Sequence, residues 1–563
     1  MIFSGGGLKN VLWCDRLCQM KRNKKSKAEE VQRWFKEKVT YEGEAYAIDL
    51  EQAAAVVDES KNAIVVARAG SGKTRTIVAK IVYLVAKCRV KPEEIMAFVF
   101  NANAAKEINE RLSKMQVDGE PVMENVKIAS TFHAFSRKII YEVSEGKEKC
   151  GEILAEKKDD FVLAIVCRMI KDKKWGERIR EFMLGPEAEE RKLADEEVLH
   201  FSRMMASFIN RAQQRFLGGG ETLAECAEKY LGNTQVDARE RQFIEIGMEC
   251  FKRYHWFLLD EKGKNRLAGF EKYGTDFNLI VSWASKIILR GGEKIEKLLK
   301  NKKYILIDEY QDFSQLFLAA VMAVREVAKD AKLFVVGDDW QAINRFAGSD
   351  VEYFKEFEKY FPEDCRRFEI STNYRCNYVI VDTARKFMQK SMREKGHFKA
   401  KSWRAGKVVI VNPRETKLYE LIKREKKAKS ILILHRNNET QRDGSLTEVL
   451  RALKEEVVKR KIMKKDEFDE KVKIMTMHKS KGLEAEVVII LEADEGVIPK
   501  THPDTILYSM FGETEKVAMD DQKRLFYVAM TRAKKRLYII HKPGNDGFIK
   551  FLGRGVEKME EIL

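Results

Sequence analysis

The feature that most constrains this chain is a glycine-rich octapeptide, Ala67 to Thr74, placed between an apolar run and a stretch with helical spacing. The apolar run is Ile64-Val65-Val66, and the helical stretch extends from Thr74 to Ala86. Glycines let a backbone turn so that several N–H groups face one phosphate, and the positive end of the following helix favours the same anion. The segment therefore predicts a phosphate-binding loop in an α/β fold.

Two side chains of this loop have a chemistry of their own. Lys73 would reach the β- and γ-phosphates of a nucleoside triphosphate, and the Thr74 hydroxyl would bind Mg²⁺. The loop departs from the usual pattern, because Ala67 replaces its first glycine and Arg68 stands at another position where glycine is usual. The residues that we expect to contact ATP here are Ala67, Arg68, Ala69, Gly70, Ser71, Gly72, Lys73 and Thr74.

An acidic pair at the end of another apolar run complements the loop. Ile305-Leu306-Ile307 is followed directly by Asp308 and Glu309. Asp308 would hold Mg²⁺ through its water shell, and Glu309 would orient and deprotonate the attacking water. Such a pair is common after a strand, but together with the phosphate loop it predicts hydrolysis of ATP, with Mg²⁺ as the metal cofactor.

The rest of the sequence mostly alternates strand-sized apolar runs with helical stretches, which indicates parallel sheets covered by helices. From about 140 to 300 the pattern changes to helix-like, strongly charged sequence that resembles an insertion. Charged residues from Lys454 to Lys465 favour a solvated helix rather than a binding site. Strands are expected at 64–66, 95–100, 304–307, 333–336, 408–411, 431–434, 487–491 and 537–540.

These patterns predict the division of the chain. The expected parts are a basic, helical N-terminal extension (1–45), a first α/β domain in two parts (46–140 and 301–370), an inserted helical subdomain (141–300), a second α/β domain (371–545) and a C-terminal tail (546–563).

Composition narrows the partners. Lys and Arg number 105 against 88 Asp and Glu, so the net charge of +17 and the pI of about 9.2 favour an anionic partner such as nucleic acid. The nine cysteines have no metal-ligand spacing, and only Cys14 and Cys18 lie close together, which argues against zinc, an iron–sulfur cluster or a disulfide framework. No apolar run approaches the roughly 18 residues of a membrane helix. We expect an intracellular protein that does not bind membranes.

Further motifs follow in a fixed order. After the phosphate loop come Asp308-Glu309-Tyr310-Gln311-Asp312, Gly337-Asp338-Asp339-Trp340-Gln341-Ala342-Ile343, Asn373-Tyr374-Arg375, His478-Lys479-Ser480-Lys481-Gly482-Leu483-Glu484 and Tyr527-Val528-Ala529-Met530-Thr531-Arg532-Ala533. This ordered set resembles the UvrD/Rep type of superfamily 1 DNA helicases, over roughly residues 47 to 541. The resemblance implies an α/β fold with two RecA-like P-loop NTPase domains and an inserted helical subdomain.

The resemblance also implies roles for residues around the nucleotide base and sugar. Gln52 would read adenine, for which a side-chain amide is suited because it both donates and accepts hydrogen bonds. Tyr374 would stack on adenine, Arg75 would pack near the base, and Glu484 would bind the ribose hydroxyls.

At the γ-phosphate the resemblance implies three more side chains. Gln341 would sense the phosphate and couple hydrolysis to the grip on DNA. Arg375 and Arg532 would contact the phosphate from the second domain as arginine fingers, since guanidinium groups match phosphate oxygens and stabilise transition-state charge.

On the DNA side, the resemblance places Phe100, Thr131, His133, Phe346 and His478 along a single strand. Aromatic rings stack on bases without reading their sequence. His478 would link the nucleotide site to this track. For both phenylalanines the alternative is ordinary core packing.

The chain departs from the family pattern at several places. Asn103 replaces a usual lysine near Phe100, Asn344 replaces a usual tyrosine, and Phe346 replaces a usual tryptophan. Only about forty residues separate Arg436 from His478, where many relatives carry a large helical insertion.

The function implied is an ATP-dependent 3′-to-5′ DNA helicase or translocase, acting on single-stranded DNA and on junctions with duplex. Repair or recombination, repair or replication proteins as partners, and a place at the nucleoid would suit it. Two alternatives stay open: a DNA-stimulated ATPase that strips proteins without unwinding, and a nucleotide-gated DNA-binding module that recruits partners.

Overall fold

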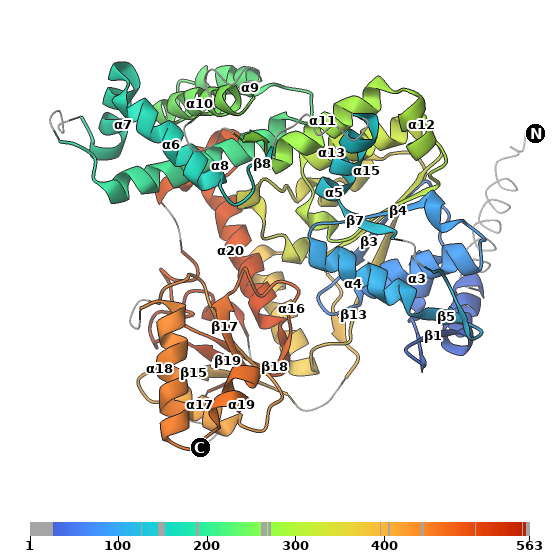
Figure 1. Cartoon of the computed structure of the whole chain (residues 1–563). Helices are drawn as coiled ribbons and strands as arrows, with labels where there is room; N and C mark the ends of the chain where they lie inside the picture. The colour runs from blue at the N-terminus through green and yellow to red at the C-terminus, as the bar shows by residue number, and fades with distance from the viewer. Residues whose placement is uncertain are drawn as a thin grey trace, which may run out of the picture.

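The computed structural model (Figure 1) describes residues 26–124, 127–144, 152–186, 191–259, 267, 272–394, 396–402, 406–440, 444–500, 503–553 and 555–558. The predicted N-terminal extension and C-terminal tail lie partly outside these ranges, as do Cys14 and Cys18. None of the helices in these ranges combines the length and the apolar character that a bilayer crossing requires.

A six-stranded sheet forms the centre of the part that we name the first lobe. Its main strands are rich in Val, Ile and Phe and are buried on both faces, as expected when helices cover a parallel sheet on both sides. In spatial order the strands are β12 (Cys365–Ile370), β3 (Asn62–Ala67), β11 (Lys332–Gly337), β10 (Tyr304–Ile307), β4 (Ile95–Val99) and β7 (Ala129–Thr131).

Every pair of neighbouring strands in this sheet is parallel. The carboxyl ends therefore meet at one edge, where the phosphate loop follows β3 and Asp308 follows β10. Helices on the two faces are α2 (Leu50–Val56), α3 (Lys73–Ala86), α4 (Ala102–Ser113), α5 (Phe132–Val143), α11 (Phe277–Arg290), α12 (Glu293–Leu299), α13 (Gln315–Val327), α14 (Glu352–Lys355) and α15 (Phe357–Tyr360).

A group of helices with its own apolar core, here named the helical region, lies beside the first lobe (Figure 1). Its helices have apolar residues at helical spacing, with Phe201, Met205 and Phe208 along the buried side of one helix. The helices are α6 (Lys158–Lys171), α7 (Lys173–Leu184), α8 (Asp195–Phe216), α9 (Leu223–Leu231) and α10 (Ala238–Leu258). A distant segment, the 3₁₀ helix η5 (Pro503–Phe511), adds Leu507, Tyr508, Met510 and Phe511 to this core.

A second six-stranded parallel sheet with its helices forms the second lobe. Its strands are β17 (Val472–Thr476), β16 (Ile431–His435), β18 (Ala485–Ile490), β19 (Ala533–Ile540), β15 (Lys407–Val411) and β20 (Glu557–Lys558), and its helices are α16 (Tyr378–Met392), α17 (Leu418–Arg424), α18 (Leu446–Lys459), α19 (Lys465–Lys471) and α20 (Glu515–Met530). Figure 1 shows α20 extending from this lobe toward the helical region.

Smaller sheets complete the fold. One contains β2 (Glu44–Ala45), β1 (Val39–Tyr41), β5 (Met115–Val117) and β6 (Glu120–Pro121); the others pair β13 (Thr372–Asn373) with β14 (Lys399–Ala400) and β8 (Glu152–Ile153) with β9 (Tyr273–Thr275).

The α/β class with parallel sheets is confirmed, and each predicted strand is present. One local prediction was wrong. The stretch Lys454 to Lys465 is not one helix, because α18 ends at Lys459 and α19 begins at Lys465. Arg460 caps the first helix, and the backbone of Lys461 has a φ of 55°, which is incompatible with a continuing helix.

Candidate functional site

The phosphate loop has the backbone form that its sequence predicts. Gly70 and Gly72 have φ values of 68° and 87°, a region that other residues rarely adopt. Space also requires glycine, since a Cβ on Gly72 would lie 2.8 Å from Nε2 of Gln52, and one on Gly70 would lie 2.7 Å from Cβ of Arg375. The loop is thus folded tightly against both α2 and the Asn373-Tyr374-Arg375 motif.

Two oxygen ligands suited to Mg²⁺ lie side by side beyond the loop. Thr74 Oγ1 donates to Asp308 Oδ2 at 3.2 Å, although 234 residues separate them. Burial and the neighbouring Glu309 raise the pKa of Asp308. Mg²⁺ usually takes one or two protein oxygens together with phosphate oxygens and water, so this hydroxyl and carboxylate fit the metal that the sequence implies.

Glu309 is surrounded by cations and donors. Lys73 Nζ lies 3.5 Å from Glu309 Oε2, and Gln311 Nε2 donates to the same oxygen. Burial alone would raise the pKa of Glu309, but Lys73 and Lys481 outweigh it and hold the pKa below its usual value. Glu309 is therefore an ionised acceptor at neutral pH, as a residue that orients an attacking water needs to be.

Arg532 is a side chain of the second lobe that contacts the first lobe near these residues. It precedes β19 as Glu484 precedes β18, and Ala485 pairs with Ala533, so both side chains start from the same edge of the second sheet. Arg532 Nη2 donates to Gln341 Oε1 of the first lobe at 3.2 Å. It also donates to the carbonyl oxygens of Val528 and Leu483 and to the Thr531 hydroxyl.

Arg532 is 1% exposed and, among the described residues, forms no ion pair with a carboxylate. Burial and the neighbouring Arg375 lower its pKa to about 9, so the guanidinium still carries its charge at neutral pH. A buried charge normally has a partner of opposite sign. An anion beside Lys73 and Arg532 would supply it.

Gln341 occupies the junction between the lobes. Its Nε2 donates to Asp338 Oδ2 at 2.5 Å, while its Oε1 accepts from Arg532. Lys481 Nζ donates to the Gln341 carbonyl oxygen at 3.2 Å and to the carboxylate of Asp312. The predicted sensor therefore contacts groups from both lobes.

Arg375 has a carboxylate partner, unlike Arg532. Its Nε donates to Glu484 Oε2 at 2.7 Å, and its Nη1 donates to the Thr531 carbonyl oxygen at 3.3 Å. Lys534 also pairs with Glu484, and these contacts hold the pKa of Glu484 below its usual value even though burial opposes the shift. The predicted finger and the predicted ribose ligand are thus adjacent.

The residues predicted to meet the base gather at the start of α2. Tyr374 is 42% exposed and donates its hydroxyl hydrogen to Asp49, the N-cap of α2. Arg75 lies 4.1 Å from the ring centroid of Tyr46 and donates to the Ala47 carbonyl oxygen.

Gln52 differs from the other base-side residues because it is already bonded at both ends of its amide. Its Nε2 donates to the Ser71 carbonyl oxygen at 3.0 Å, and its Oε1 accepts from the Asp49 N–H. It therefore ties α2 to the phosphate loop, and its second N–H and the second lone pair of Oε1 are the groups left for adenine.

Arg68 is the one loop residue whose groups turn away from the phosphate position. Its N–H donates to the Ile370 carbonyl oxygen, and its guanidinium pairs with Asp338 and Asp339. The prediction that Arg68 contacts ATP therefore has no support in its geometry. Ala67, by contrast, is simply the last residue of β3, and the turn itself begins beyond it.

Two of the predicted DNA contacts face each other across the lobes. Phe346, on the 3₁₀ helix η4 (Arg345–Ala347), is 54% exposed, and its ring centroid lies 5.5 Å from that of His478 in the second lobe. Burial, with Arg436 and Lys481 nearby, lowers the pKa of His478 to about 4, so the ring is neutral at neutral pH. Phe346 is not part of the core.

The other three lie on the first lobe and are more enclosed. Phe100 is partly buried, with its ring 5.5 Å from that of Phe317. Thr131 caps α5 by accepting from the Ala134 N–H, and burial lowers the pKa of His133. The exposed ring of Phe277 lies 5.0 Å from His133 and extends this surface. Nothing in the local sequence of Phe277 distinguished it from other helix-starting aromatics.

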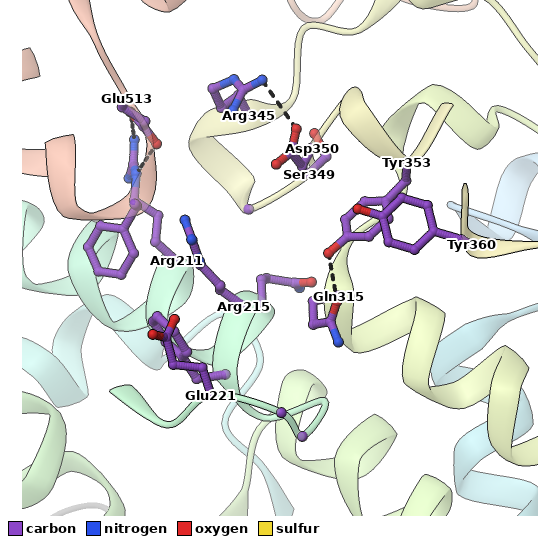
Figure 2. Close-up of a pocket in the computed structure, with 16 residues that line it drawn as sticks. Arg211, Arg215, Glu221, Gln315, Arg345, Ser349, Asp350, Tyr353, Tyr360 and Glu513 are labelled. Atoms are coloured by element: carbon purple, nitrogen blue, oxygen red, sulfur yellow. Dashed lines mark hydrogen bonds and ion pairs between the residues drawn. The ribbon is translucent and has the colours of Figure 1, made fainter. Parts of the chain in front are cut away.

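A cavity of about 350 Å³ lies next to the loop that carries Phe346, and Figure 2 shows the residues that line it. Arg345 of this loop donates to Asp350 and pairs with Asp521 of α20 at 3.5 Å. On the other side, both oxygens of Glu513 accept from Arg211 of the helical region. Charged contacts therefore join the helical region and both lobes around this loop.

Sequence reasoning assigned no role to three residues that hold the site together. Lys481 and Asp312 form an ion pair between the lobes. Asn373 donates to the Ala69 carbonyl oxygen at 2.5 Å and accepts from the N–H of Arg375. All three lie inside the motifs described above, so their position in these motifs was the sequence feature that could have identified them.

Comparisons with known proteins identify relatives of this chain. The profile described as "UvrD/REP helicase N-terminal domain" matches residues 48–362, and the profile "UvrD-like helicase C-terminal domain" matches residues 432–543. DNA helicase IV of Escherichia coli (strain K12) is 27% identical over 534 residues, covering 89% of this chain and 69% of that protein.

Two further relatives match this chain at lower identity and over fewer residues. A probable DNA helicase of Mycoplasma pneumoniae is 24% identical over 513 residues, covering 88% of this chain and 83% of that protein. The ATP-dependent DNA helicase SRS2 of Saccharomyces cerevisiae is 24% identical over 343 residues, covering 59% of this chain and 26% of that protein. Because the first profile alone matches more than half of the sequence, the chain belongs to the UvrD/Rep family of DNA helicases.

Proposed function

We propose that this chain is an ATP-driven motor that moves 3′ to 5′ along single-stranded DNA and separates duplex ahead of it. Its two lobes, each with one parallel sheet, would act as RecA-like motor domains that close on ATP and reopen after hydrolysis. The division into these two domains and an inserted helical subdomain is part of the proposal. Repair or recombination would be its setting.

One observation carries the proposal: Arg532, which is buried and has no carboxylate partner among the described residues, reaches from the second lobe to Gln341, beside the loop that holds Lys73. A protein that only bound nucleotide would gain nothing from placing an uncompensated guanidinium there. A motor needs such a group, since it links the charge that develops at the γ-phosphate to the position of the second lobe.

In this proposal each side chain has a defined task. Lys73 binds the β- and γ-phosphates, and Glu309 accepts a hydrogen bond from the attacking water and takes its proton. Thr74 and Asp308 hold Mg²⁺, which supplies charge neutralisation at the phosphates when bound. Arg532 and Arg375 stabilise the transition state from the opposite lobe.

Coupling to DNA would pass through the loop of Gln341 to Phe346. Only three residues separate Gln341 from Arg345, where η4 begins. Phe346 and His478 meet across the same junction that Gln341 and Arg532 bridge. Closing the lobes would therefore change the gap in which a base stacks at the same moment as it assembles the phosphate site.

The test has two stages. ATP hydrolysis is measured with and without single-stranded DNA, and then unwinding is measured on duplexes with a 3′ or a 5′ tail. Stimulated hydrolysis with unwinding from the 3′ tail supports the proposal. Stimulated hydrolysis and translocation without strand separation would favour a protein-stripping translocase, and DNA binding that depends on ATP without phosphate release would favour a recruitment module.

Replacing Phe346 with alanine is expected to weaken binding of single-stranded DNA by about 5- to 150-fold, because one stacked base contributes roughly 1–3 kcal/mol. Fluorescence anisotropy with a labelled oligonucleotide measures the change. Phe346→Trp should retain most of the affinity, since the wider ring still stacks.

Trp256→Ala is the matched control, because Trp256 is equally exposed (53%) but lies on α10 of the helical region. Equal losses for the Phe346 and Trp256 variants would show that Phe346 is not a specific contact.

A further inference from the structure

The phosphate loop contains a buried cation that faces away from the phosphates. Arg68 is 8% exposed, and its Nη1 lies 2.9 Å from Asp338 Oδ1 and 2.6 Å from Asp339 Oδ1. Its guanidinium also covers the Trp340 ring at 4.1 Å from the centroid. Because this position is usually glycine in such loops, the contacts are an addition that this sequence makes to the motif.

Asp338 connects Arg68 to Gln341, the candidate sensor of the γ-phosphate. One carboxylate oxygen of Asp338 accepts from Arg68, and the other accepts from Gln341 Nε2 at 2.5 Å. An ionised carboxylate can only accept hydrogen bonds. Gln341 must therefore turn its NH₂ group toward Asp338, and this leaves its Oε1 facing Arg532.

The charge of Arg68 is what keeps this arrangement in place. Asp338 is fully buried, and the side chain of Asp339 is only 13% exposed. Two adjacent carboxylates in such surroundings repel each other, and the guanidinium that pairs with both offsets this repulsion. Consistently, burial alone would raise the pKa of Asp339, but Arg68 outweighs it and lowers the pKa.

The guanidinium of Arg68 lies at the contact between the two lobes. Trp340, beneath the guanidinium, is completely buried, and its ring lies 5.4 Å from that of Tyr527 in α20. Ala69, next to Arg68, also packs in the apolar cluster of the second lobe. Arg68 therefore acts where the lobes touch and not at a remote part of the first lobe.

We infer that Arg68 is a positioning residue for ATP hydrolysis, which holds Asp338 in place and thereby fixes the Gln341 amide with its oxygen toward Arg532. The inference rests on the proposed function, because it assumes that Gln341 takes part in hydrolysis. It adds a residue that contacts neither phosphate nor DNA.

The test combines Arg68→Gln, Arg68→Lys and Gln341→Ala in a double-mutant cycle. We expect Arg68→Gln to lower the DNA-stimulated kcat by about 10- to 100-fold, the cost of a misplaced group at an active site, with KM for ATP changed by less than about 3-fold. Arg68→Lys should recover part of this loss, because lysine restores the charge but cannot bridge both carboxylates as a guanidinium does.

The cycle separates positioning from general damage. If Arg68 acts through Gln341, Arg68→Gln should cost less than about 2-fold in the Gln341→Ala background, because coupled residues are not additive. Arg253→Ala serves as the control, since Arg253 is an ion-paired arginine of α10, in the helical region. It should leave kcat unchanged.

Each result decides the inference. A wild-type kcat for Arg68→Gln, a rise in KM without a fall in kcat, or equal costs in both backgrounds would overturn it. If thermal unfolding shows that Arg68→Gln does not fold, Arg68→Lys is put through the same cycle: a cost that disappears in the Gln341→Ala background supports the inference, and a persistent cost or none overturns it. A wild-type protein without DNA-stimulated hydrolysis would instead overturn the proposed function.

Discussion

Replacing Arg532 with alanine is expected to lower kcat for ATP hydrolysis by about 10³-fold or more, the range found for arginine fingers. The reason lies in its surroundings: the guanidinium is buried, keeps its charge at neutral pH and has carbonyl, hydroxyl and amide oxygens as partners in place of a carboxylate. Its full charge is thus available to a phosphate. Steady-state phosphate release in the presence of single-stranded DNA measures the effect.

Arg536→Ala is the matched control for this experiment. Arg536 lies on β19, the strand that Arg532 directly precedes, but it is 41% exposed in its side chain and pairs with Glu425. Its loss should change kcat by less than about 2-fold. A comparable loss of activity in both variants would mean that the Arg532 effect arises from damage to β19 and not from the phosphate site.

Replacing Lys73 with alanine is expected to reduce ATP turnover by about 10²–10³-fold, to near background, while the protein stays folded. Lys73 Nζ is 3.5 Å from Glu309, so its removal takes away both a phosphate ligand and a cation that keeps Glu309 ionised. Phosphate release measures turnover, and thermal unfolding reports the fold.

The control for Lys73 lies at the other end of the same helix. Lys87 caps α3 and contacts Glu30 and Trp34 near the surface, so Lys87→Ala should leave turnover unchanged. Normal hydrolysis by the Lys73 variant would remove the basis for the whole site assignment.

The strands that consist of apolar runs were predicted from the sequence. The strands that are short or contain charged residues were missed. β10 and β16 consist mainly of Ile and Leu, as expected for strands that are buried on both faces of a parallel sheet. β12 contains Arg366, Arg367 and Glu369, because an edge strand can present polar side chains to solvent. β7 has only three residues, too few for any periodicity to appear.

For the candidate site, local motifs were informative wherever a residue acts at the end of its own strand. Thr74 and Asp308 meet because β3 and β10 are parallel members of one sheet, which the alternating pattern already implied. The orientation of Arg68 was not predictable, since its partners lie 270 and 271 residues away and nothing beside Arg68 indicates them. The burial of η5 in the helical region was not predictable either, because the helices that it contacts are distant in the sequence.

The path of α20 has a mechanical consequence. At one end, α20 begins three residues after η5, which buries Leu507 and Phe511 among the helices of the helical region. At the other end, it leads to Arg532. Its 16 residues span about 24 Å. A swing of roughly 10° about the phosphate end would carry the far end sideways by about 4 Å over this length. In the proposed motor, this helix would act as a lever arm that displaces the helical region with each ATP turnover.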